Sequence, residues 1–296
     1  MDWQPTSRER ERPRNILFPI SGSIGLCVAR RLGSSHHILI GDYSPAALSA
    51  AKDSLGSAGH LITAKDIDVS SETSVASFAK AAAELGPIKT VILTAGVSSA
   101  ANNTQLIYAT NLAGTALVLD TFLPLMPPGS SLTVIASVAG HLLPRIPELE
   151  TYLATAPTAS LIMHHELERD TDPSHAYGVS KLGCIVRAQR QAAEWGHRGV
   201  RINTVSPGAI ETPMLGQVLR SEQGPFAQSM IHNTPLGRTG TPDEIAGVVA
   251  FLAGPDASFF AGTDLIVDGG VLSMQRWPRS AAESAHAIVS SDGHKE

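Results

Sequence analysis

The chain has 296 residues, of which 43% are hydrophobic and 17% charged, and its net charge is −5. This length and apolar content suit a single α/β domain with a sizeable core, and the absence of a basic balance excludes a nucleic-acid-binding face. The two cysteines, Cys27 and Cys184, lie in apolar, helix-like contexts and form no disulfide framework, so we expect buried free thiols.

The first 13 residues are charged and poor in apolar side chains, which is typical of a flexible arm and not of a signal peptide. No apolar run is expected to reach the length of a membrane span. No spacing of histidine, cysteine or acidic side chains indicates a metal site. We therefore expect a cytoplasmic protein that binds no metal.

Residues 15–20 form a short apolar run that predicts a buried strand, and a glycine turn and a helix follow it. The backbone N–H groups of such a unit can hold a pyrophosphate. Against the pattern G-x-G-x-x-G, Gly22 and Gly25 match the second and third glycines, and Ile20 stands in place of the first. An ordinary strand-to-helix turn is the alternative. On the first interpretation, the phosphate-binding residues are Ser21, Gly22, Ser23, Ile24 and Gly25.

A second strand over residues 37–42 ends in Asp42, where a carboxylate can bind the two ribose hydroxyls of a dinucleotide. No basic residue follows at Tyr43 or Ser44, and a carboxylate would repel a 2′-phosphate, so NAD is favoured over NADP. The alternative role of Asp42 is to cap the helix that starts at Pro45, a task that Ser44 can also perform.

Further along the chain, strands and helices continue to alternate. This alternation predicts one domain over residues 14–274, with a doubly wound parallel sheet of seven strands, helices on both faces, and a flexible tail from residue 275. Ligands of such sheets bind at the carboxyl ends of the strands. The remaining expected elements are helix 45–57, strand 61–67, helix 71–85, strand 90–94, helix 105–125, strand 131–137, helix 177–197, strand 200–205, a loose helical region over 213–233, helix 241–253 and strand 264–267.

Tyr177 and Lys181 are four positions apart, so they share one face of their predicted helix. An ammonium held near a phenol favours the phenolate form, and a tyrosine placed in this way can act as a general acid or base near neutral pH. The alternative is an amphipathic helix with a half-buried ring. Asn111 stands among apolar residues of an earlier helix and must find polar partners if it is buried.

The ordered set of motifs resembles the short-chain dehydrogenase/reductase family in its one-domain NAD(P)-dependent form. The motifs are SGSIG at 21–25, DVS at 68–70, TAG at 94–96, Asn111, Ser137 at a strand end, YGVSK at 177–181, SPG at 206–208 and VDGG at 267–270. The resemblance covers residues 14–273. Ile20 departs from the family glycine and Thr94 from its usual asparagine, which leaves open whether Ile20 weakens cofactor binding.

The resemblance implies specific roles for these residues. Tyr177 would exchange a proton with the substrate oxygen, Lys181 would assist it and bind the nicotinamide ribose, and Ser137 would hold the substrate oxygen. Asn111 would fix a water in a proton relay. Further cofactor contacts would come from Asp68, Val69, Ala95, Gly96, Pro207, Gly208, Ile210 and Thr212.

Ser137 and Tyr177 are much farther apart in sequence than is usual for the family, and residues 142–175 form an insertion between them. This insertion resembles the subset that includes bacterial 3α-hydroxysteroid dehydrogenase/carbonyl reductase. Its apolar residues could line a lipophilic pocket, or form a lid or a subunit contact, and either a homodimer or a homotetramer is expected. The candidate substrate-pocket residues are His141, Leu142, Leu143, Met214 and Leu215, with a satisfied structural role as the alternative for His141.

The leading functional hypothesis is an NAD-dependent oxidoreductase that interconverts a secondary alcohol and a ketone on a lipophilic, steroid-, terpenoid- or polyketide-like molecule. One alternative is a non-redox isomerase, epimerase or cyclase on the same scaffold. Another is a binding protein that has lost catalysis. The substrate, the reaction direction and the stereochemistry are not determined by the sequence.

Overall fold

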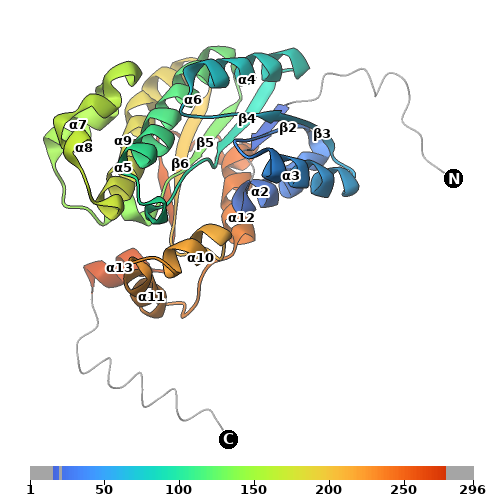
Figure 1. The fold of residues 1–296 in the computed structure, drawn as a ribbon. Coiled ribbons are helices and arrows are strands. Elements are labelled where there is room, and N and C mark those ends of the chain that lie inside the picture. The colour runs from blue at the N-terminus through green and yellow to red at the C-terminus, as the bar shows by residue number, and fades with distance from the viewer. Residues whose placement is uncertain (1–15, 20–21, 278–296) are drawn as a thin grey trace, which may run out of the picture.

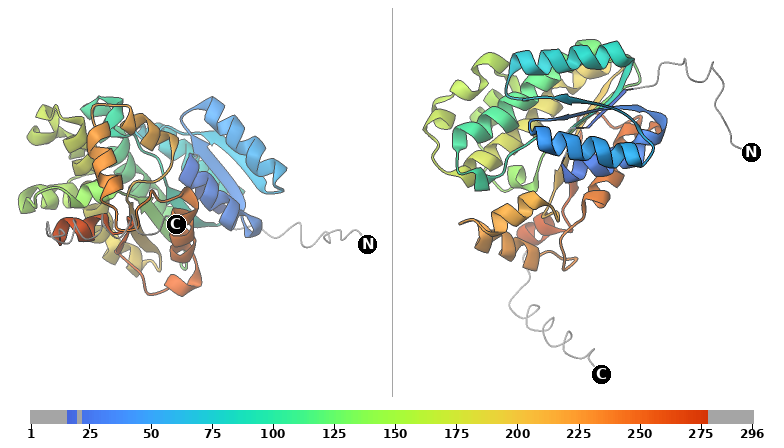
Figure 2. Two further views of the ribbon diagram at one scale, coloured as in Figure 1. Left: turned by 90° about the horizontal axis from the view of Figure 1, so that it is seen from below. Right: turned by 45° about the vertical axis from the view of Figure 1, so that its right-hand side comes forward.

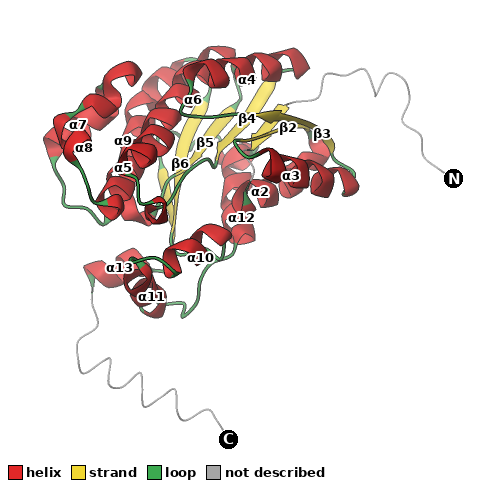
Figure 3. Cartoon of the chain, viewed as in Figure 1, coloured by secondary structure: helices red, strands yellow, loops and turns green. Residues whose placement is uncertain are grey.

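Seven parallel strands form a single sheet at the centre of the molecule (Figures 1 and 3). The computed structural model describes residues 16–19 and 22–277. The chain runs outward in one direction from β1 and then in the other from β4, which confirms the predicted doubly wound sheet. In spatial order the strands are β3 (Leu61–Asp66), β2 (His37–Asp42), β1 (Ile16–Pro19), β4 (Ile88–Leu93), β5 (Ser131–Ile135), β6 (Arg201–Pro207) and β7 (Asp264–Val267).

Helices cover both faces of the sheet, as expected for parallel strands joined by helical crossovers. One face carries α2 (Ser23–Leu32), α3 (Pro45–Ser57) and α12 (Pro242–Ala253). The other carries α4 (Glu72–Leu85), α6 (Gly114–Phe122) and α9 (Pro173–His197). The shorter helices are α5 (Thr104–Ile107), α7 (Pro147–Thr155), α8 (His165–Arg169), α10 (Pro213–Leu219), α11 (Gly224–His232) and α13 (Val271–Arg276).

The two cores follow from the alternation of side chains along each strand. Leu39 packs into the cluster under α4, α6 and α9, whereas its neighbours Ile38 and Ile40 pack into the cluster under α2, α3 and α12. Cys27 belongs to one cluster and Cys184 to the other, and both are buried free thiols, as predicted.

Several helix boundaries differ from the sequence prediction. Helix α9 begins at Pro173, earlier than Tyr177, because the side chain of Asp172 caps it and proline suits its first turn. The expected helix over 105–125 is interrupted by a π-helical segment, Tyr108–Ala113. The loose helical region over 213–233 is two helices, α10 and α11, which together with α13 lie beyond the carboxyl ends of the central strands (Figures 1 and 2).

The insertion folds as α7, a 3₁₀ segment (Thr158–Met163) and α8, and it packs on the outer side of α9 and α5 (Figure 1). Its apolar residues join a third hydrophobic cluster with residues of the π-helical segment and α9. These insertion residues are Leu149, Leu153, Ala156, Leu161 and Leu167. The insertion therefore packs against, and supports, the helical segments that carry Asn111 and Tyr177.

One stretch of the described residues, Thr104–Leu125, has the length of a membrane-spanning helix and a mean hydropathy of 1.4. The sequence had suggested that no run was that long. Of the most apolar 18-residue part of this stretch, 61% is buried inside the domain, between the sheet, α4 and α9. The stretch is therefore a core helix, and the described part of the chain has no clear membrane span.

Candidate active site

The side chains of Ser137, Tyr177 and Lys181 line one cavity at the carboxyl ends of the strands. Ser137 follows β5 and starts a 3₁₀ turn, Val138–His141, in which its Oγ accepts a hydrogen bond of 3.2 Å from the Ala139 N–H. Tyr177 and Lys181 come from the first turns of α9. The structure thus brings together three of the four predicted catalytic residues across a 40-residue gap in sequence, as the positions of Ser137 and Tyr177 show.

The ammonium of Lys181 is held deep in the site. The residue is 5% exposed, and its Nζ donates a 2.9 Å hydrogen bond to the carbonyl oxygen of Ile135, at the end of β5. The same Nζ lies 5.8 Å from the centre of the Tyr177 ring. A buried ammonium needs such partners, and the Ile135 carbonyl fixes the charge between the strand that leads to Ser137 and the ring of Tyr177.

Asn111 is fully buried within the π-helical segment, a kind of helix distortion that is frequent at functional sites. Its Oδ1 accepts a 2.9 Å hydrogen bond from the Val97 N–H, and its Nδ2 donates to the Val97 carbonyl at 2.9 Å and to Ser180 Oγ at 3.2 Å. These bonds use the side chain to lock the loop after β4 against α9. A role in holding a relay water remains a prediction.

Gly96 and Gly140 allow the segments of the site to approach one another closely. A Cβ on Gly96 would lie 3.2 Å from Asn111 Oδ1 and 3.4 Å from Lys181 Nζ. A Cβ on Gly140 would lie 2.7 Å from the backbone nitrogen of Leu182. The loop after β4 and the turn after β5 therefore both contact α9 through glycines, which brings Ser137 near Tyr177 and Lys181.

The predicted cofactor-binding residues line the same cavity, whose volume is about 1110 Å³. Ser21 lies outside the described residues. Gly22 has a φ of 107°, a backbone conformation that side chains other than glycine rarely adopt, and it precedes the first turn of α2. The lining includes Gly22, Ser23, Ile24, Gly25, Asp42, Asp68, Val69, Ala95, Gly96, Pro207, Gly208, Ile210 and Thr212.

The sequence left open whether Asp42 or Ser44 caps α3. Ser44 Oγ caps α3 by accepting a hydrogen bond from the Ala47 N–H at 3.3 Å. Asp42 Oδ1 accepts a 2.7 Å hydrogen bond from the Ser44 N–H, which orients the carboxylate, and Asp42 also lines the cavity. The cap is therefore supplied by Ser44, as proposed from the sequence, while Asp42 supports the same turn.

Three of the five candidate substrate-pocket residues line the cavity. Leu142, Met214 and Leu215 line the cavity, but Leu143 packs in the third hydrophobic cluster and is not part of the lining. His141 also lies outside the lining, because its Nε2 pairs with Asp264 Oδ2 at 2.7 Å. The structural alternative for His141 is therefore the one that the geometry favours.

Sequence reasoning missed several lining residues. Apart from Leu142 and Ser174, no residue of the insertion lines the cavity, so Leu142 is the one apolar side chain that the insertion contributes to the wall. Other apolar residues of the wall come from α10 and α11, where the spacing of Phe226 and Met230 on one helical face was an available signal. The missed residues include Ser98, Leu106, Thr110, Ser174, Phe226 and Met230.

No group of three or more histidine, cysteine or acidic side chains that could hold a metal ion occurs among residues 16–19 and 22–277. Hydroxyl, phenol, ammonium and carboxylate groups supply polar atoms to the lining of the cavity. These groups are placed at strand ends and on α9, at the edge of the sheet where doubly wound proteins bind their ligands.

Comparison with known proteins finds relatives over most of the chain. A family model described as short chain dehydrogenase matches residues 19–173, and one described as enoyl-(acyl carrier protein) reductase matches residues 158–272. The short-chain dehydrogenase/reductase bsc3 of Alternaria brassicicola is 37% identical over 86% of this chain and 93% of its own length. The 3-alpha-hydroxysteroid dehydrogenase/carbonyl reductase of Comamonas testosteroni is 33% identical over 63% of this chain and 73% of its own length.

Solved structures share the fold. A short-chain dehydrogenase/reductase of Brucella melitensis, described as a glucose/ribitol dehydrogenase, superposes with a TM-score of 0.68 at 26% identity, over 87% of this chain and 96% of its own. One from Serratia marcescens does so with a TM-score of 0.68 at 23% identity, over 87% of this chain and 97% of its own. The chain therefore belongs to the short-chain dehydrogenase/reductase family of oxidoreductase enzymes, which bind NAD(P).

Proposed function

We propose that the protein is an NAD-dependent oxidoreductase that interconverts a secondary alcohol and a ketone on a lipophilic small molecule. The observation that carries this proposal is the composition of one continuous cavity. Ser137, Tyr177 and Lys181 lie in it together with Asp42 and an apolar wall from α10 and α11. The named activity of the Comamonas testosteroni relative, a hydroxysteroid dehydrogenase and carbonyl reductase, is consistent with such a substrate.

The cavity fits a nicotinamide dinucleotide on observations of this chain. A Cβ on Gly22 would meet no atom within 4 Å, so the space over the turn is open, and the glycine is required by its φ of 107°. The N-terminus of α2, a helix of ten residues, directs backbone N–H groups to this space and would hold the pyrophosphate. Asp42 would bind the adenosine ribose, which favours NAD because a 2′-phosphate would be repelled.

The residues of the chain supply the proton chemistry and the orientation. The phenol of Tyr177 would donate a proton to the oxygen of a ketone, or remove one from an alcohol, and the hydroxyl of Ser137 would hold the same oxygen. Lys181, fixed by the Ile135 carbonyl, would place its positive charge beside the phenol as charge develops there. The bound nicotinamide supplies or accepts the hydride.

The substrate half of the cavity is apolar and broad. Met214, Leu215 and Val218 from α10 face it together with Phe226 and Met230 from α11. Methionine and leucine side chains adapt to bulky apolar surfaces, so we infer a steroid-, terpenoid- or polyketide-like ring system and not a small polar sugar. Assembly as a homodimer or homotetramer stays a prediction.

Purified protein with NADH should reduce at least one of cyclohexanone, a decalone and a 3-ketosteroid. The loss of the nicotinamide absorbance measures this reaction. Product formation from an unsaturated or epimerisable ketone without net NADH consumption would instead favour a non-redox isomerase. Calorimetry that detects binding of neither NADH nor NADPH would favour a binding protein without catalysis. Tighter binding of NADPH than of NADH would contradict the assigned preference.

A further inference from the structure

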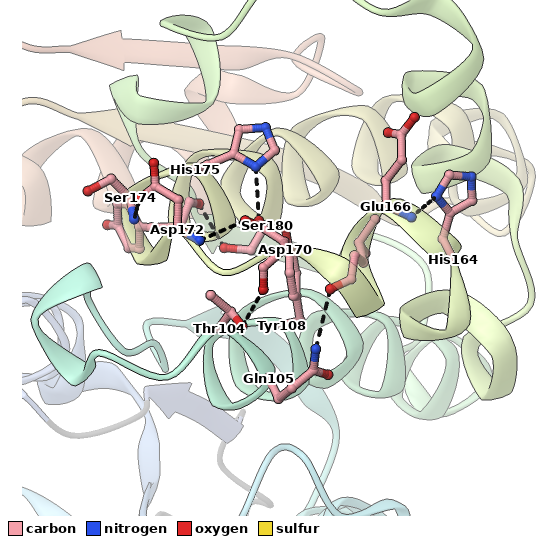
Figure 4. A network of polar contacts seen from close by, with 12 residues as sticks. Thr104, Gln105, Tyr108, His164, Glu166, Asp170, Asp172, Ser174, His175 and Ser180 are labelled. Atoms are coloured by element: carbon pink, nitrogen blue, oxygen red, sulfur yellow. Dashed lines mark hydrogen bonds and ion pairs between the residues drawn. The ribbon is translucent and has the colours of Figure 1, made fainter.

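Asp170 lies near the end of the insertion, and it joins the start of α9 to α5 and the π-helical segment, which are distant in sequence (Figure 4). Its Oδ2 accepts a 2.6 Å hydrogen bond from Tyr108 Oη and lies 2.9 Å from His175 Nδ1. Its Oδ1 accepts a 2.9 Å hydrogen bond from the Asp172 N–H. Its backbone carbonyl accepts a further 2.9 Å hydrogen bond from Thr104 Oγ1.

The partners of Asp170 lead directly to two of the assigned catalytic residues. Tyr108 begins the π-helical segment that contains Asn111, one turn further on. His175 is two residues before Tyr177 on α9, and Asp172 is the residue whose side chain caps that helix. Asp170 therefore connects the start of the helix that carries Tyr177 with the segment that carries Asn111.

The carboxylate is well satisfied and nearly enclosed, since its side chain is 7% exposed. Burial alone would raise the pKa of Asp170, but the hydrogen bonds with Tyr108, His175 and the Asp172 N–H outweigh it, so this pKa lies below its usual value. Burial, followed by the hydrogen bond to Asp170, raises the pKa of Tyr108 above that of a free phenol. Near neutral pH the cluster is an ionised acceptor surrounded by donors.

Asp170 does not line the cavity, so it is not placed to contact the substrate. The insertion has a second polar contact of similar kind, in which Thr158 Oγ1 donates to Asp120 Oδ2 of α6 at 2.5 Å. Asp120 also accepts a 3.4 Å hydrogen bond from Gln191, which lies well beyond Tyr177 on α9. The chain therefore offers a matched control, a hydroxyl–carboxylate bond of the same insertion that is remote from Tyr177.

We propose that Asp170 is a positioning residue that sets the place of Tyr177 relative to Asn111, so that the insertion acts on the reaction through the first turns of α9. The catalytic consequence rests on the proposed oxidoreductase function. The structural consequence, that the start of α9 is held in place, does not depend on that function. On this account Asp170 contributes to catalysis without contacting either the substrate or the cofactor.

Asp170→Asn and Tyr108→Phe should each lower kcat about ten- to hundredfold with 3-ketosteroid or cyclohexanone as probe, because small displacements of a reacting group cost that much. KM for the ketone and the Kd for NADH should not change, because Asp170 touches neither ligand. Thr158→Val should leave kcat unchanged. The double variant should lose less than the product of the two single losses, because one change weakens and the other removes the same hydrogen bond.

Hydrogen–deuterium exchange of the same variants without any ligand tests the structural consequence by itself. Asp170→Asn should speed exchange at amides 174–181, and Thr158→Val should not. If the wild-type enzyme reduces none of the ketones, the proposed function fails while this measurement still decides the role of Asp170. Unchanged exchange at 174–181, or exchange that rises equally throughout the domain, would overturn the proposal.

Discussion

Gly140 is the point at which a single added methyl group should separate the two halves of the catalytic site. It lies in the turn after Ser137 and faces the backbone of α9 directly after Lys181. In Gly140→Ala the new Cβ would lie 2.7 Å from the Leu182 nitrogen and 3.0 Å from the Lys181 carbonyl carbon. Both are backbone atoms, so no side-chain rotation can relieve the overlap.

The size of the effect follows from these distances. Ordinary van der Waals contact begins at 3.4 Å, so the turn and α9 must move apart by about 0.7 Å. Overpacking of this kind lowers the free energy of unfolding by about 1–3 kcal/mol. A displacement of nearly 1 Å between Ser137 and Tyr177 should lower kcat by about tenfold or more, since misplacement by 1 Å can cost a hundredfold.

Urea unfolding and NADH-dependent ketone reduction measure the two effects. The control is Gly196→Ala on the same helix, where an added Cβ meets nothing within 4 Å. Alanine is the better helix former, so this variant should gain about 0.5–1 kcal/mol and keep its activity. Equal stability and activity of Gly140→Ala and the wild-type protein would refute the close packing of the Ser137 turn on α9.

Three further predictions concern other contacts of the site. Asp42→Asn should raise the affinity for NADPH relative to NADH by about tenfold or more, because each 1.4 kcal/mol of removed repulsion is tenfold in Kd. Calorimetric Kd values for both cofactors measure this ratio, and an unchanged ratio would contradict the assigned role of Asp42. Asn111→Leu should lower the free energy of unfolding by about 1–3 kcal/mol, because the N–H and C=O of Val97 lose their buried partners, and a denaturation midpoint equal to that of the wild type would exclude this. The depressed pKa of Asp170 implies stability that is present above the unfolded-state value of about 4 and is lost as the pH falls through the folded-state value. The stability difference between wild type and Asp170→Asn should therefore be larger at neutral pH than in acid, and a constant difference across this range would argue against an ionised Asp170.

The sheet, and the gathering of the candidate cofactor residues along one cavity, could be predicted from the sequence because both depend on local patterns. Short apolar runs followed by small or acidic residues mark strand ends, and the carboxyl ends of parallel strands share one edge of the sheet. Asp42 and Gly96 could be placed near each other for this reason without any knowledge of their contacts.

The substrate half and the insertion were less predictable, because their apolar residues show only that some face is buried. Leu149 and Leu153 have the spacing of a buried helix face, but the spacing does not say whether that face meets a ligand, a subunit or the rest of the domain. The structure shows that they pack against the third hydrophobic cluster, behind α9. Pairs formed across long separations in sequence have no local signal either, as the bond between Tyr108 and Asp170 illustrates.

The start of α9 is an exception, since its signal was present. Asp172 followed by Pro173 is a typical cap and first helical residue, and it places the helix start four residues before Tyr177. The π-helical distortion at Asn111, by contrast, has no such local signal, and the bonds of Asn111 to Val97 and Ser180 span long separations in sequence.

Tyr177→Phe tests the central claim most directly, because it removes one phenolic oxygen and leaves the ring in place. The variant should keep the NADH affinity and the denaturation midpoint of the wild-type protein. It should lose ketone reduction by about a hundredfold or more, the size expected for loss of general acid catalysis. Full turnover by a folded Tyr177→Phe enzyme that binds NADH would contradict the assignment of Tyr177 as the proton donor.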